Sequence, residues 1–188
     1  MKSFILDTGE LILVDTGLNF SGASTIKSTL EKNNYMLKDV KYIVLTHSHM
    51  DHIGGLKDLS KNGVFEVVSH NEDADAIQNS TGVKVDRRIN DGEDIVPGVK
   101  VIYIPGHTRG NISLITNKVL IAGDTLRGVK DGISPPPSNF NANNMEDIKN
   151  LSRLLAYDFD YIALSHGKDF ESGGKVAVEK LIAQISKS

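Results

Sequence analysis

Short apolar runs alternate along the chain with stretches in which apolar residues recur at helical spacing. The runs 4–7 and 11–14 flank a turn-forming Thr-Gly-Glu segment, and this pattern predicts an opening β-hairpin. Ser21 is the predicted N-cap of a first helix, because apolar residues follow it every three or four positions. The start of the chain is therefore expected to fold as strand, strand and helix.

The same alternation continues to the end of the chain. Runs rich in β-branched and aromatic residues predict strands over 41–45, 65–69, 99–104, 112–116, 119–122 and 161–164. Helical spacing predicts helices over 54–59, 72–78, 145–155 and 178–185. The stretch after Asp124 contains three consecutive prolines and is expected to be an irregular loop. Strands and helices mixed within one domain, residues 1–188, predict an α/β or α+β layered fold, and periodicity does not choose between the two.

Composition places the chain among globular proteins and restricts its chemistry. Hydrophobic residues make up 39% of the 188 residues, which is enough for a buried core. The 21 Lys and Arg against 24 Asp and Glu give a net charge of -3, so no nucleic-acid partner and no membrane partner are expected. The chain has no Cys, which excludes disulfides, thiolate catalysis and Cys-ligated zinc. Any metal must therefore bind nitrogen and oxygen ligands.

Hydropathy predicts a cytoplasmic protein. The first apolar stretch reaches Asp7 before it attains the roughly 7 to 15 residues of a secretion-signal core. No other apolar run approaches the roughly 18 residues of a membrane span, since Lys, Asp or Gly interrupts the strands. We therefore expect neither secretion nor insertion into a membrane.

Three of the six histidines lie in one segment, His-Ser-His-Met-Asp-His, directly after a predicted strand. His47 and His49 alternate with Ser48, so their side chains can point in the same direction. Asp51 and His52 are expected in the turn that follows. Imidazole and carboxylate groups are ligands for zinc, iron or manganese. The end of this one strand can thus supply ligands to two adjacent metal ions.

Two further histidines and one aspartate also lie in predicted turns after strands. His107 is part of Pro-Gly-His-Thr, Asp124 of Gly-Asp-Thr and His166 of Ser-His-Gly. Each alone is an ordinary loop residue, but together with the histidine cluster they indicate a shared metal site. Asp124 could bridge two cations through its two carboxylate oxygens. His70 has no such neighbours in the sequence and is interpreted as structural.

These motifs, taken in order, resemble the metallo-β-lactamase superfamily. The series begins at Asp15 in Leu-Val-Asp-Thr-Gly, continues through the cluster 47–52, and ends with the segments around His107, Asp124 and His166. All five superfamily motifs are present in the expected order. The resemblance implies an α/β fold, a four-layer αββα sandwich with a dinuclear metal site at one edge.

The resemblance also implies a role for each matching residue. One metal ion would bind His47, His49 and His107. The second would bind Asp51, His52 and His166, with Asp124 bridging the two ions. Asp15 would orient the metal-binding loop. The implied cofactors are two divalent metal ions, with zinc as the first choice and iron and manganese as alternatives.

The activity implied by the resemblance is hydrolysis of an ester, thioester or lactone by a hydroxide that bridges the two metals, with Asp51 and Asp124 as catalytic carboxylates. The Gly-His-Thr and Gly-Asp-Thr segments are similar to the glyoxalase II branch. The stretch after His166 is too short for the helical glutathione-binding domain of that branch, so we expect that domain to be absent. A phosphodiesterase, a mononuclear-iron dioxygenase and a non-catalytic metal-binding protein remain alternatives.

Three cations follow three of the candidate ligands. Arg109, Arg127 and Lys168 come shortly after His107, Asp124 and His166, respectively. Because loops at strand ends form the mouth of a site built there, these cations suggest a negatively charged small-molecule substrate. The alternative, that they are ordinary solvated charges, has equal support from the sequence. A homodimer is also left open, since another chain could complete the first sheet.

Overall fold

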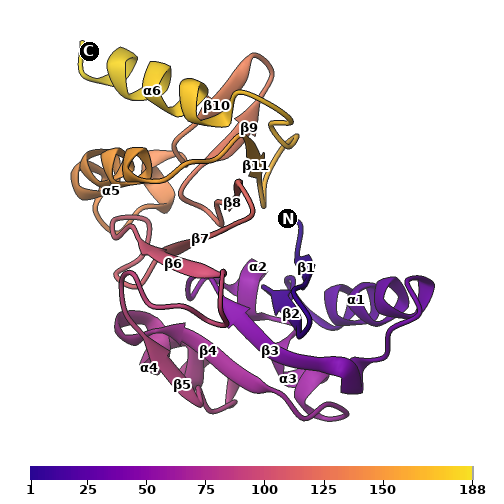
Figure 1. Ribbon diagram of the computed structural model, residues 1–188. Helices are drawn as coiled ribbons and strands as arrows, with labels where there is room; N and C mark the ends of the chain where they lie inside the picture. The colour runs from indigo at the N-terminus through magenta and orange to yellow at the C-terminus, as the bar shows by residue number, and fades with distance from the viewer. Residues whose placement is uncertain (188) are drawn as a thin grey trace. The chain divides into compact units, whose positions relative to one another are not determined.

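The computed structural model describes residues 1–187, which divide into two units, each built on its own β-sheet (Figure 1). Unit 1 comprises residues 1–89, and unit 2 begins at residue 90. Both units mix strands with helices, so the predicted mixed α/β class is confirmed. The expectation of one domain over residues 1–188 stays a prediction.

Unit 1 contains a five-stranded sheet with the strand order β1-β2-β3-β4-β5. Its strands are β1 (Phe4–Asp7), β2 (Leu11–Val14), β3 (Val40–Leu45), β4 (Glu66–His70) and β5 (Arg87–Ile89). β1 is antiparallel to β2, as the predicted hairpin requires, and the other pairs are parallel. The helical segments are α1 (Phe20–Lys32), the 3-10 helix η1 (Leu37–Asp39), α2 (Met50–Ile53), α3 (Leu56–Ser60) and α4 (Asn71–Thr81).

The core of unit 1 lies between one face of this sheet and its helices. Leu13 of β2 and Ile43 of β3 belong to the same buried cluster as Ile26 and Leu30 of α1. Burial of a Leu or Ile side chain of this kind stabilises a fold by about 1.5–3 kcal/mol. Val14 pairs with Val44 in the parallel register, so the chain leaves β2 and β3 at the same edge of the sheet.

Unit 2 contains a four-stranded sheet with the order β11-β8-β7-β6 and a separate hairpin. The sheet strands are β6 (Lys100–Tyr103), β7 (Ile112–Thr116), β8 (Val119–Ile121) and β11 (Tyr161–Ala163), and the hairpin strands are β9 (Arg127–Val129) and β10 (Gly132–Ser134). β11 is parallel to β8, whereas the other neighbours are antiparallel. The helical segments are η2 (Ser138–Phe140), α5 (Asn144–Asn150), η3 (Leu151–Ala156) and α6 (Gly174–Ile185).

The core of unit 2 joins its sheet to the helical segments that follow. Ile102 and Ile162 of the sheet share a buried cluster with Leu151 and Leu154 of η3 and with Val178 of α6. This packing holds β8 and β11 in place, and the candidate ligands Asp124 and His166 follow these two strands.

The structure differs from the expected elements at several places. The prediction of Ser21 as an N-cap is wrong, because Oδ1 of Asn19 accepts the backbone N–H of Ser21 at 2.9 Å and α1 starts two residues earlier than expected. Asp51 and His52 lie in α2 rather than in a turn. The strands β5, β9 and β10 were not predicted, because each has only three residues and arginine or glycine interrupts its apolar pattern. The loop expected after Asp124 therefore contains a hairpin.

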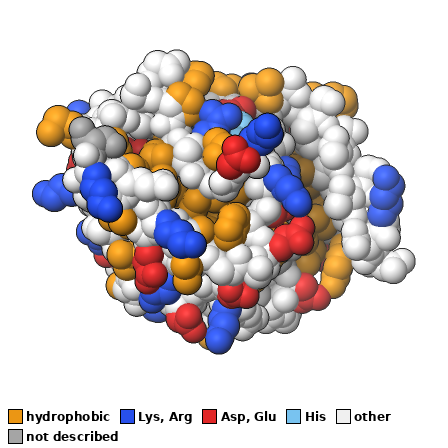
Figure 2. Space-filling view, turned by 90° about the horizontal axis from the view of Figure 1, so that it is seen from above, with side chains coloured by type: hydrophobic (Ala, Val, Ile, Leu, Met, Phe, Trp, Pro, Cys, Tyr) orange, Lys and Arg blue, Asp and Glu red, His pale blue; other side chains and the backbone are white. Residues whose placement is uncertain are grey.

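No helix within residues 1–187 has both the length and the apolar character needed to span a membrane. Figure 2 shows one face of the molecule, on which Lys and Arg side chains are interspersed with acidic and hydrophobic ones. The charges on that face are thus mixed rather than gathered into a field of one sign, which agrees with the small net charge of -3.

Candidate metal centre

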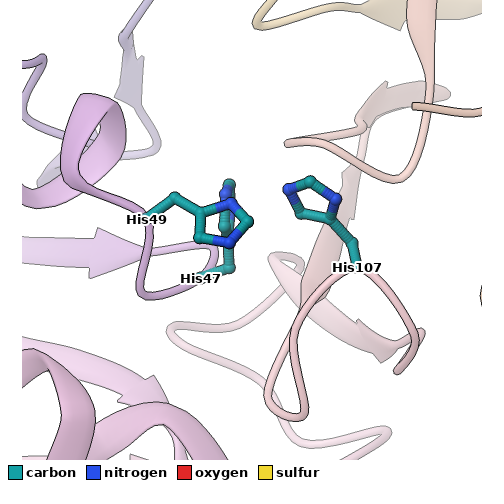
Figure 3. A group of neighbouring side chains, drawn as sticks. All are labelled: His47, His49 and His107. Atoms are coloured by element: carbon teal, nitrogen blue, oxygen red, sulfur yellow. The ribbon is translucent and has the colours of Figure 1, made fainter. Parts of the chain in front are cut away.

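Three histidines of unit 1, His47, His49 and His52, lie close together shortly after β3. Figure 3 shows the side chains of His47 and His49, and their ring centroids are 4.8 Å apart. The rings of His47 and His52 are 4.0 Å apart, and both residues are fully buried. Imidazole rings this close to one another can act together as ligands of one metal ion.

Asp15 holds this histidine cluster by hydrogen bonds. Its Oδ1 accepts the backbone N–H of Thr46 at 2.8 Å, and its Oδ2 lies 2.7 Å from Nδ1 of His52. The hydroxyl of Thr46 also donates to the carboxylate and lies 3.1 Å from Nδ1 of His47. Asp15 is fully buried and adopts a left-handed backbone conformation with φ 61°, which Asp tolerates better than most residues. The structure therefore places Asp15 where it can orient the segment that carries His47 and His52.

The distance between His52 and Asp51 fits a shared cation. Nε2 of His52 lies 3.6 Å from Oδ2 of Asp51. Two ligand atoms on one tetrahedral zinc, with bonds of about 2.0–2.1 Å, are about 3.4 Å apart. Nδ1 of His52 contacts Asp15, so Nε2 is the ring nitrogen that faces Asp51. This pair has the geometry expected of two ligands to one metal.

Two glycines after α2 bring this segment against the residues that follow Asp15. A Cβ at Gly54 would lie 1.8 Å from the carbonyl oxygen of Leu18, and a Cβ at Gly55 would lie 2.2 Å from that of Thr16. The backbone N–H of Thr16 also donates to the carbonyl oxygen of His52 at 2.7 Å. Glycine is therefore required for the close approach that keeps α2 beside Asp15.

Asp73 supports the same loop from α4 and was missed by the sequence reasoning. Its Oδ2 accepts the backbone N–H of Ser48 at 2.8 Å, and the residue is only 3% exposed. Asp73 lies in an acidic helix start, Glu-Asp-Ala-Asp, which gives no signal for this contact with a residue far away in sequence. The hydrogen bond fixes the backbone between His47 and His49.

In unit 2, Asp124 lies between two histidine rings. Its Oδ2 is 3.4 Å from Nε2 of His107, and its Oδ1 is 3.5 Å from Nε2 of His166. Each carboxylate oxygen thus faces one imidazole at the separation of two ligands on a common cation, about 3.4 Å. The two oxygens of Asp124 are thus placed to act as metal ligands, one beside His107 and one beside His166.

The parallel pairing of β8 and β11 explains why Asp124 and His166 meet. Ile121 pairs with Ala163 in the register of these strands. Asp124 and His166 each follow the paired residue at the same offset, so they leave the sheet at the same edge. His107 lies in the loop after β6, shown in Figure 3.

His107 has two further neighbours that the sequence reasoning missed. Its Nδ1 lies 2.8 Å from Oδ1 of Asn141, and its backbone N–H hydrogen-bonds to the carboxyl group of Asp147. Asp147 is fully buried, and burial raises its pKa to about 7, although hydrogen bonds from Asn141 and His107 oppose this shift. No local motif marks either residue, because both contacts depend on the fold.

The remaining residues singled out in the sequence take different positions. Nδ1 of His70 accepts the backbone N–H of Glu72 at 3.2 Å and caps α4, in agreement with a structural role. Arg109 and Lys168 are exposed, whereas Arg127 begins β9 and is partly buried. Among residues 1–187, Nε of Arg127 is a buried nitrogen with no hydrogen-bond partner.

All seven expected ligands are among the His and Asp side chains that could hold a metal ion. Unit 1 supplies His47, His49, Asp51 and His52, and unit 2 supplies His107, Asp124 and His166. Their donors are nitrogen and oxygen only, which suits zinc, iron or manganese.

Comparison with known proteins agrees with these motifs. Residues 3–166 match the family model described as the metallo-beta-lactamase superfamily. The chain is 30% identical over 175 residues to metallo-beta-lactamase domain-containing protein 1 of Xenopus laevis, covering 85% of this chain and 67% of that protein. Hydroxyacylglutathione hydrolase of Nitrobacter winogradskyi is 31% identical over 115 residues, which cover 58% of this chain and 42% of that protein. The chain thus spans less than half the length of that hydrolase.

Solved structures show the same fold. A metallo-beta-lactamase from Pontibacter korlensis matches with a TM-score of 0.80 at 19% identity, covering 99% of this chain and 87% of that chain. A metallo-beta-lactamase family protein from Thermus thermophilus matches with a TM-score of 0.74 at 22% identity, covering 98% and 74%. The predicted fold type is therefore confirmed.

Proposed function

Because the chain belongs to the metallo-β-lactamase superfamily, we propose that it is a metal-dependent hydrolase that cleaves an ester, thioester or lactone. The observation that carries this proposal is Asp124, whose two oxygens face His107 and His166 at 3.4 and 3.5 Å. A relative named hydroxyacylglutathione hydrolase, which by its name acts on a thioester, gives further support.

The proposed centre holds two divalent ions, and zinc is our first choice. One ion would bind His47, His49 and His107, the other would bind Asp51, His52 and His166, and Asp124 would give one oxygen to each. The contacts of the two rings support this assignment. Asp15 contacts Nδ1 of His52, and Asn141 contacts Nδ1 of His107, so Nε2 of each ring faces a neighbouring carboxylate.

The bound ions would lower the pKa of a water molecule to near 7 and polarise the substrate carbonyl. The residues of this chain supply the rest. Asp51, whose side chain is 36% exposed, can reach solvent and orient the attacking water. His47 and His52 are fully buried, so water does not reach the inner side of the proposed centre. The hydrogen bonds that hold these two rings therefore do not compete with water. Asp15 and Thr46 hold those rings, so their geometry does not depend on the ions.

We further propose that the substrate carries a negative charge. A Cβ at Gly128 would lie 2.4 Å from the backbone oxygen of Lys168, and the N–H of Gly128 donates to the carbonyl oxygen of His166 at 2.8 Å. This close junction keeps Arg127 and Lys168 near the backbone of His166. A guanidinium and an ammonium group at such a place can pair with a carboxylate or phosphate on the substrate.

The test is turnover by protein reconstituted separately with zinc, manganese and iron. We expect hydrolysis of at least one class among p-nitrophenyl carboxylate esters, thioesters and lactones, and faster turnover of anionic members. His70→Ala, which changes a histidine outside the centre, should retain that activity. If only phosphodiesters were hydrolysed, the chain would be a phosphodiesterase instead. If no substrate were turned over with any of the metals, the result would favour a non-catalytic metal-binding protein.

A further inference from the structure

We propose that Asn141 and Asp147 act as positioning residues that fix His107 in the tautomer able to bind a metal ion through Nε2. This inference rests on the proposed function, because it concerns a ligand of the proposed centre. It assigns a role to two residues in and before α5 that carry no recognisable motif.

The ring of His107 is held between two oxygen atoms. Oδ1 of Asn141 lies 2.8 Å from Nδ1, and Oδ2 of Asp124 lies 3.4 Å from Nε2. His107 is only 1% exposed, so bulk water does not compete with these oxygens for the ring nitrogens. These two oxygens therefore influence which ring nitrogen carries the proton.

The orientation of the Asn141 amide follows from its other contacts. Its Nδ2 lies 3.2 Å from Oδ2 of Asp147 and 3.0 Å from Oδ1 of Asn144. Both of these oxygens accept hydrogen bonds, so the amide nitrogen must face them and the amide oxygen must face His107. An amide oxygen only accepts, and Nδ1 of His107 must therefore carry the proton. The lone pair of the neutral ring is left on Nε2, toward Asp124.

Asp147 is itself fixed in place. It is fully buried, and its carboxyl group also accepts the backbone N–H of His107. A Cβ at Gly106 would lie 2.2 Å from the backbone nitrogen of Asp147, so the loop before His107 is in direct backbone contact with α5. Asp147 thus holds the backbone of His107 directly and its ring through Asn141.

Further hydrogen bonds join the same two segments and provide a matched control. The backbone N–H groups of Ala142 and Asn143 donate to the carbonyl oxygens of His107 and Gly106 at 3.0 and 2.8 Å. Nδ2 of Asn150 donates to the carbonyl oxygen of Pro105 at 3.0 Å. The side chain of Asn150 therefore anchors the loop through the Pro105 carbonyl, whereas the side chain of Asn141 contacts the His107 ring.

The experiment uses the full chain labelled with ¹⁵N-histidine. Two-bond ¹H–¹⁵N correlation spectra of the metal-free protein report the tautomer of each ring, with His107 assigned by the signal lost in His107→Ala. Zn²⁺ affinity is measured by competition with a chromogenic chelator. The variants are Asn141→Leu, which has the same branched shape and no acceptor, Asn141→Asp, which keeps an acceptor, and Asn150→Leu.

In the wild type we expect the Nδ1–H form of His107. Asn141→Leu should shift the ring toward the Nε2–H form and weaken Zn²⁺ binding by about 10- to 100-fold. Asn141→Asp should retain the Nδ1–H form and most of the Zn²⁺ affinity. Asn150→Leu should lower thermal stability and leave the tautomer unchanged.

An Nε2–H ring in the wild type would overturn the inference by itself, even if Asn141→Leu did not fold. Equal tautomer and Zn²⁺ affinity in Asn141→Leu and wild type would overturn it as well. If Asn150→Leu changed the tautomer and the Zn²⁺ affinity as much as Asn141→Leu does, Asn141 would act only by anchoring the loop. A wrong substrate assignment would leave all of these readouts as expected, so the two failures are distinguishable.

Discussion

Unit 1 supplies its candidate ligands from six consecutive residues, 47–52, whereas unit 2 collects its three from separate loops at 107, 124 and 166. In unit 1 one strand end, one buried carboxylate and two close glycine contacts define the ligand geometry. In unit 2 the geometry depends on strand pairing and on a hydrogen-bonded contact between a loop and α5. The comparison teaches that the candidate ligands of one unit can be encoded by neighbouring residues in the sequence, whereas those of the other come together only once the fold has formed.

The largest effect is expected at Asp124, the one residue that would serve both metal ions. Asp124→Ala should abolish hydrolysis and reduce bound metal from about two ions per chain toward zero, because each ion loses a charged ligand. Elemental analysis after purification without chelator and a kcat/KM measurement check this.

His70→Ala is the control for Asp124→Ala. It removes the cap of α4, which costs about 1 kcal/mol, and should leave metal content and activity in place. If the two variants lost metal and activity to a similar extent, Asp124 could not be distinguished as a ligand from His70, an ordinary histidine of unit 1.

The next effect concerns Asp15, which holds the candidate ligands of unit 1. Asp15→Ala should lower the free energy of unfolding of the metal-free protein by about 3 kcal/mol, because it leaves the buried N–H of Thr46 without its acceptor and puts Ala in a left-handed conformation. Asp15→Asn tolerates that conformation and should lose less stability, while Zn²⁺ affinity falls by about 10- to 100-fold. Urea unfolding and Zn²⁺ titration measure the two effects. An equal loss of stability in both variants would show that the backbone conformation is not the cause.

A smaller effect is expected at Arg127, which begins β9 in unit 2. Arg127→Ala should raise KM for an anionic ester by about 10-fold, equivalent to one charge-assisted hydrogen bond, and leave KM for a neutral ester with the same leaving group nearly unchanged. Metal content should not change. Lys130→Ala, an exposed cation at the end of the same hairpin, is the matched control. Equal effects of Arg127→Ala on both esters would leave Arg127 as a surface charge.

The smallest effect compares how stability depends on pH for two tyrosine hydrogen bonds. Tyr35 in unit 1 bonds to a carboxyl group, whereas Tyr103 in unit 2 bonds to a backbone carbonyl. The hydroxyl of Tyr35 donates to Oδ2 of Asp7 at 2.5 Å, and this hydrogen bond is the main cause that lowers the pKa of Asp7 and raises that of Tyr35. A lowered carboxyl pKa contributes stability that is present above about pH 4 and lost as pH falls through the folded value. The raised pKa of Tyr35 contributes stability that is present below about pH 10 and lost above it.

In Tyr35→Phe, stability should therefore fall less than in the wild type when the pH is lowered below about 4 or raised above about 10. In Tyr103→Phe, the lost hydrogen bond goes to the backbone carbonyl of Arg109, which does not titrate in this range, so stability should fall by the same amount at every pH up to about 10. Thermal melting from pH 3 to 11 makes the comparison, and parallel curves for the wild type and Tyr35→Phe would contradict the assigned cause.

The same contrast explains how far the sequence could be interpreted. The cluster 47–52 was predicted as a ligand source because its residues are contiguous, and the resemblance to the superfamily, confirmed by the match over residues 3–166, pointed to Asp15. Asp73, Asn141 and Asp147 were missed because their contacts with the loops of His49 and His107 join residues that are far apart in sequence. The hairpin β9–β10 was missed because strands of three residues carry too little periodicity to recognise.

The parallel pairing of β11 with β8 also has a consequence for the order of events during folding. The hairpins β6–β7 and β7–β8 close over a few residues, but β11 can join β8 only after the chain has passed through β9, β10 and α5. Closing the longer loop costs more entropy and is slower. We therefore expect His166 to be the last of the three candidate ligands of unit 2 to reach its place, so metal binding that depends on His166 should follow the pairing of β11 with β8.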